Sequence, residues 1–100
     1  MSTRWLVERR LSESAQRLRR LREELAVADE QLAALGDAAD DSRLRALVSE
    51  TPLAERDHRE NQRHADAMAR HRADLSSAIS ELERSQDELL DRLGTMAAHE

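Results

Sequence analysis

The 100-residue sequence has no cysteine, lysine, phenylalanine or tyrosine, and it has one tryptophan, one proline and two glycines. Without cysteine the chain can form no disulfide, no thiolate nucleophile and no cysteine-based zinc site, as is common in a reducing compartment. A thick globular core is not expected, because such cores depend on aromatic and branched side chains. Two glycines also leave little scope for an active site built on loops.

Hydrophobic residues make up 39% of the chain and charged residues 37%, and leucine and alanine supply most of the apolar mass. This composition is typical of a long helix or a coiled coil. The net charge of −5 argues against a chain that coats nucleic acid. No apolar run approaches the roughly 18 residues of a membrane span, and no signal-peptide pattern opens the chain. We therefore expect a cytoplasmic protein without membrane insertion.

Two seams of mostly apolar residues at heptad spacing form the main pattern. The first occupies positions 7, 11, 14, 18, 21, 25, 28, 32 and 35, where only Ser14 is polar. The second follows positions 44, 47, 51, 54, 58, 61, 65, 68, 72, 75, 79, 82, 86, 89 and 93. A stripe of this kind must be buried against another helix. The sequence thus predicts an all-α fold, an antiparallel helical hairpin with coiled-coil packing.

We expect residues 1–100 to form a single helical-hairpin domain. Its first helix is predicted over about 3–35, with Ser2 or Thr3 as the cap and Gly36 as the stop. An acidic turn at 36–42 and a short helix at about 42–50 follow. Thr51-Pro52 then starts a long helix over about 52–93, and a frayed tail covers 94–100. Whether Pro52 breaks the helix or only kinks it stays open.

The charge pattern also favours an antiparallel arrangement. Residues 1–22 carry seven arginines and two acids, and residues 23–41 carry seven acids and no base. Residues 42–72 have seven arginines and five acids, whereas residues 73–100 have two arginines and seven acids. Folding the chain back on itself sets basic blocks beside acidic ones. For the arginine-rich run at 17–22 we therefore expect ion pairs between helices and no nucleic-acid binding.

Weak packing at positions 51–65 predicts that two hairpins pair into a four-helix assembly, a homodimer. These positions include Thr51, His58 and Asn61, which are poor seam residues. The apolar positions further along are better suited to self-association. They are Met68, Leu75, Ile79, Leu82, Leu89 and Leu93.

A histidine motif supplies the first candidate site. Glu55 and His58 have the i, i+3 spacing of carboxylate-bridged di-iron sites in helical bundles, and Glu60 and His64 lie one turn apart. In this spacing the chain resembles short two-helix ferritin-like proteins that build a bundle on dimerising. That resemblance implies a metal-binding bundle. The simpler interpretation is solvated or seam-filling histidine, with no metal and no cofactor.

Two further candidates are partner-binding residues. The carboxylates Asp37, Asp40 and Asp41 of the expected turn resemble those at the coiled-coil tips of secondary-channel transcription factors, although aspartates also cap helices and turns. Trp5 is either an end plug or a partner-binding anchor.

We interpret the chain as a non-enzymatic coiled-coil scaffold or adaptor that acts through self-association and contacts with a protein partner. The alternatives are a ferritin-like metal-binding bundle formed on dimerisation and a regulator of transcription or nucleic-acid machinery that presents an acidic tip.

Overall fold

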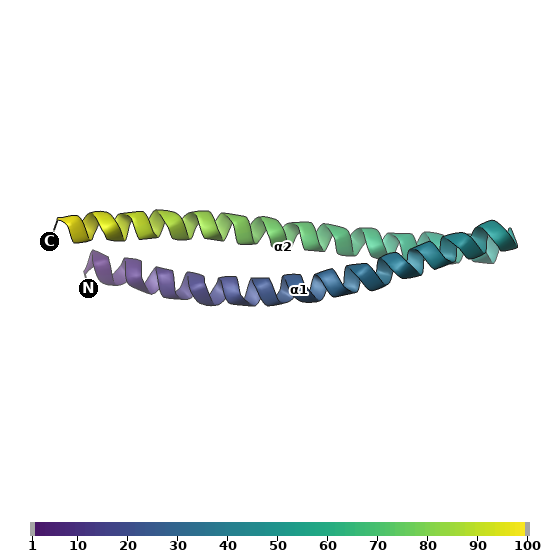
Figure 1. The fold of residues 1–100 in the computed structure, drawn as a ribbon, viewed down its shortest axis with the longest axis horizontal. Coiled ribbons are helices and arrows are strands. Elements are labelled where there is room, and N and C mark those ends of the chain that lie inside the picture. The colour runs from purple at the N-terminus through teal and green to yellow at the C-terminus, as the bar shows by residue number, and fades with distance from the viewer. Residues whose placement is uncertain (1, 100) are drawn as a thin grey trace. The chain divides into compact units, whose positions relative to one another are not determined.

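A computed structural model describes residues 2–99 as two long helices (Figure 1). Helix α1 covers Thr3–Ser49 and helix α2 covers Pro52–Ala98, each 47 residues long. Only Glu50 and Thr51 separate them, and no strand occurs among the described residues. The predicted all-α antiparallel helical hairpin is thereby confirmed.

The helix starts have the expected caps. The Ser2 hydroxyl oxygen accepts a hydrogen bond from the Trp5 amide at 3.1 Å. The Thr51 hydroxyl oxygen accepts one from the Ala54 amide at 3.2 Å. Pro52 occupies the first position of α2, where a missing N–H costs nothing. The restart predicted at Thr51-Pro52 is therefore confirmed as a break between two helices.

The turn predicted at residues 36–42 is wrong, and so is the separate short helix at 42–50. Helix α1 runs through both segments, and Gly36 keeps a negative φ. The chain reverses at Glu50, whose φ of 51° lies in the left-handed region. A glycine inside a helix costs only about 1 kcal/mol relative to alanine. Continued packing of the seam over nearly four more helical turns outweighs that cost.

The predicted tail also differs from the structure. Helix α2 passes Gly94 without a positive φ and ends at Ala98. Met96, which is half-buried, extends the apolar seam by one more position and favours the extra turn. Glu100 lies outside the described residues.

Buried and half-buried residues follow the predicted heptads closely. In α1 they include every predicted position from Val7 to Leu35 and then continue in the same register through Ala39, Ser42 and Ala46. In α2 the register from 54 to 93 is confirmed. The predicted start of the second seam is wrong, because Leu44 and Leu47 lie on the exposed side of α1.

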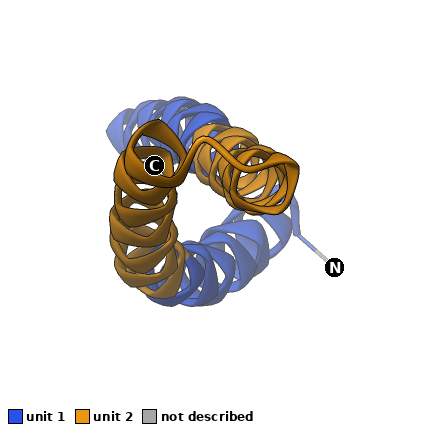
Figure 2. Ribbon diagram, turned by 90° about the vertical axis from the view of Figure 1, so that its right-hand side faces the viewer, with its two compact units in different colours: residues 1–24, 75–100 blue, residues 25–74 orange. Residues whose placement is uncertain are grey.

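The hairpin divides into two compact units, residues 1–24 with 75–100 and residues 25–74 (Figure 2). Each unit pairs antiparallel helical segments, and in each an arginine of one segment pairs with an acid of the other. In the first unit the Arg22 guanidinium lies 3.9 Å from the Glu83 carboxylate. In the second, Arg72 pairs with Asp29. Exposed ion pairs contribute at most about 1 kcal/mol each, so they select the register more than they stabilise it.

Candidate functional site

The three aspartates of the expected acidic tip lie within α1. Asp37, Asp40 and Asp41 are exposed on helical backbone at least nine residues before the chain reverses at Glu50. The acidic tip is therefore a wrong prediction, and the resemblance to tip-presenting transcription factors loses the feature on which it depended.

The histidine motif lies in the first turns of α2. Glu60 accepts a hydrogen bond from the Arg56 guanidinium at 3.3 Å, and His58 Nδ1 is buried without a hydrogen-bond partner in the described chain. Glu55 and His64 are exposed. Nowhere in residues 2–99 do three His, Cys, Asp or Glu side chains gather in a group that could hold a metal ion.

The residues expected to mediate self-association pack inside the hairpin. Leu75, Ile79 and Leu89 are buried within one chain. Met68, Leu82 and Leu93 are half-buried at neighbouring seam positions. Within one chain these residues therefore pack in the seam with α1, and their role in self-association stays a prediction.

Trp5 lies on the first turn of α1 and is 40% exposed. The Arg9 guanidinium carbon lies 5.3 Å from its ring centroid, a cation–π contact, and Arg9 also pairs with Glu13 at 3.1 Å. Trp5 therefore does not plug the end of the seam. A separate groove of about 260 Å³ at this end of the hairpin is lined by Thr3, Leu6, Val7, Arg10 and Arg92 and not by Trp5.

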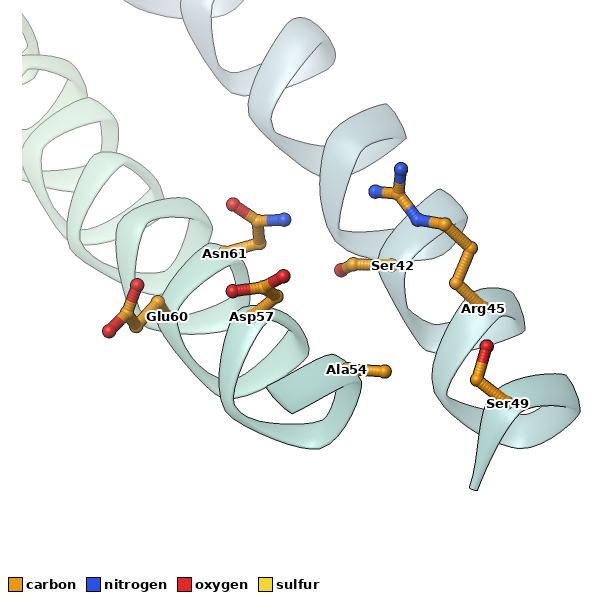
Figure 3. Close-up of a pocket in the computed structure, with 7 residues that line it drawn as sticks. All are labelled: Ser42, Arg45, Ser49, Ala54, Asp57, Glu60 and Asn61. Carbon is orange, nitrogen blue, oxygen red and sulfur yellow. The ribbon is translucent and has the colours of Figure 1, made fainter. Parts of the chain in front are cut away.

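Next to the turn, the inner faces of the helices are built from small and polar residues. A cleft of about 260 Å³ lies there (Figure 3), lined by Ser42, Arg45, Ser49, Ala54, Asp57, Glu60 and Asn61. The Ser42 hydroxyl donates to the Ala39 carbonyl oxygen at 2.9 Å, and the Asn61 amide nitrogen donates to the Ala38 carbonyl oxygen at 3.5 Å. Among the described residues that line this cleft there is no histidine or cysteine to activate a serine hydroxyl for nucleophilic attack.

The outer face of the same helical turns is apolar. Leu44, Leu47 and Val48 are 55%, 66% and 85% exposed, and their i, i+3 and i+4 spacing places them side by side on α1. We call these three residues the outer patch. Leu53, on the first turn of α2, is 69% exposed. Large apolar side chains therefore face outward here, while serine and alanine fill the seam.

Sequence reasoning missed the outer patch because it assigned Leu44 and Leu47 to the seam. A signal for the correct assignment exists in the first heptad register. Extended past Leu35, that register selects Ala39, Ser42 and Ala46 and leaves both leucines on the opposite face. The small size of the selected residues concealed the continuation.

Comparisons of the chain with protein-family models, with curated proteins and with solved structures found no match. Over the residues that the structure describes, neither helix contains a stretch long and apolar enough to cross a membrane.

Proposed function

We propose that this chain is a non-enzymatic helical-hairpin scaffold or adaptor of the cytoplasm, which acts through self-association and contacts with other proteins. The outer patch is its docking surface. One observation carries the proposal: near the turn the largest apolar side chains are exposed while small and polar ones fill the seam. A sequence that departs locally from the pattern of its own fold commonly does so at a functional site.

Energetic considerations support this assignment. Leu44, Leu47 and Val48 gain less from folding of a single chain than the buried seam residues do, because more than half of each residue remains in water. Burying apolar surface is worth about 25 cal/mol per Å². Covering this patch therefore supplies a driving force for association that the seam, already packed, does not.

The test is the mass of the protein in solution, measured by sedimentation equilibrium between about 1 and 100 μM. We expect the wild type to shift toward dimer as its concentration rises. The double variant Leu44→Ser, Leu47→Ser should stay monomeric with unchanged helicity. Leu90→Ser is the matched control, since Leu90 is an exposed helical leucine, 51% accessible, outside the patch. Equal masses for all three proteins at every concentration would contradict the proposal.

A further inference from the structure

The outer patch is bordered on one side by a base and an acid. Arg43 lies on the last turns of α1, and Glu50 directly follows the helix, where its amide still donates a hydrogen bond to the Ala46 carbonyl oxygen at 3.0 Å. Their spacing of seven residues therefore sets the two positions along the same flank. Both side chains are exposed, and neither forms an ion pair within residues 2–99. The patch therefore carries one unpaired positive and one unpaired negative charge along a single edge.

This arrangement is self-complementary. In an antiparallel pair of helices related by a two-fold axis, the same flank of each helix meets its own counterpart, running in the opposite direction. An axis that passes between Leu44 and Leu47 packs each of these leucines against the other leucine of the second copy. The same axis brings Arg43 within reach of Glu50 of the partner subunit. Because the contact is two-fold, that ion pair forms twice.

We propose that the occupant of the outer patch is a second copy of this chain, docked antiparallel through the last turns of α1 and held in register by two reciprocal Arg43–Glu50 ion pairs. This inference rests on the self-association in the proposed function. It adds that the outer patch binds a second copy of the chain, and it specifies the two-fold axis and the charge pairs of that contact. In a parallel arrangement this flank would face the opposite flank of the partner helix, so the Arg43–Glu50 ion pairs could not form and charge favours the antiparallel one.

The size of the patch sets the expected strength. A standard stable interface buries about 800 Å² per partner, which is more than three partly covered side chains and their flanks can supply. We therefore expect a dissociation constant in the micromolar range. The ion pairs should also weaken as salt is raised, because exposed charges are screened.

Charge reversal at the two flanking positions tests the pairing. In Arg43→Glu each interface carries four acids, and in Glu50→Arg it carries four bases, so each single variant should dimerise about tenfold more weakly or worse. The double variant R43E/E50R restores opposite charges and should dimerise within about threefold of the wild type. A mixture of the two single variants should form a mixed dimer.

The controls are Arg19→Glu and Glu23→Arg, which change the net charge equally at exposed α1 positions outside the patch and should dimerise like the wild type. Circular dichroism checks that every variant keeps its helix content. A double variant as weak as the singles, in a protein that still needs Leu44 and Leu47 to dimerise, would overturn the reciprocal pairing alone. If the wild type stayed monomeric at about 500 μM, the self-association would be overturned as well, and the patch would have to bind a different protein.

Discussion

Replacing Gly36 with alanine is expected to stabilise the protein. The free energy of unfolding should rise if residue 36 lies inside a helix and fall if it lies in a turn that requires glycine. In the structure Gly36 lies inside α1 with a negative φ, and a Cβ built on it has no neighbouring atom within 4 Å. Alanine in a helix interior is favoured over glycine by about 0.8–1 kcal/mol. The added methyl group therefore meets no steric cost, and the full propensity gain should appear in the free energy of unfolding.

The complementary substitution, Glu50→Gly, tests the residue at which the chain reverses. Glu50 adopts a φ of 51°, a conformation that costs an L-residue about 1–2 kcal/mol. Glycine removes this cost but loses part of the gain to the greater freedom of the unfolded chain, so we expect a net stabilisation of about 0.5–1 kcal/mol. The same variant removes one partner of the proposed Arg43–Glu50 pair and should weaken dimerisation while it stabilises the hairpin.

The assay is denaturation followed by circular dichroism at 222 nm, at a fixed low protein concentration. A gain of 1 kcal/mol corresponds to a rise in Tm of about 4–8 °C for a domain of this size. Gly94→Ala is the matched control. It also has open space around its Cβ position, but it lies near the end of α2 and should give a smaller gain. If Gly36→Ala lowered the Tm and Glu50→Gly lowered it too, the turn would lie at 36–42 and the reasoning would be refuted.

Two further substitutions test buried polar groups. Ser14 is buried and its hydroxyl has no hydrogen-bond partner in the described residues, so Ser14→Ala should raise the free energy of unfolding by about 1–2 kcal/mol in urea denaturation; no gain would show that the hydroxyl is satisfied. His58 Nδ1 is likewise buried without a partner, so His58→Leu should stabilise the hairpin by about 1 kcal/mol, measured in the same way, and a loss would instead indicate that the imidazole makes an interaction that leucine cannot replace.

Much of the fold is predictable because heptad spacing is a strong signal. The positions from Val7 to Leu35 are each occupied as predicted, since a continuous leucine stripe has one way to leave water. The start of α2 at Thr51-Pro52 is equally predictable from the sequence, because a capping hydroxyl before a proline satisfies the free amide of Ala54. The candidate site was far less predictable. Its apolar residues are exposed, and burial cannot be read from composition.

The sequence by itself determined that two long helices form, which residues line most of their seam and which charge blocks lie beside each other. Only the tertiary structure decided where α1 ends and which leucines remain in water. Gly36 and the aspartates after it are local signals for a turn, worth about 1 kcal/mol. Packing of Ala39, Ser42 and Ala46 against α2 outweighs these local signals. Because the three residues are small, the hydrophobic pattern that they form in the sequence is weak. Continuing the helix carries Leu44 and Leu47 to the outer face and so creates the patch on which the proposed function rests.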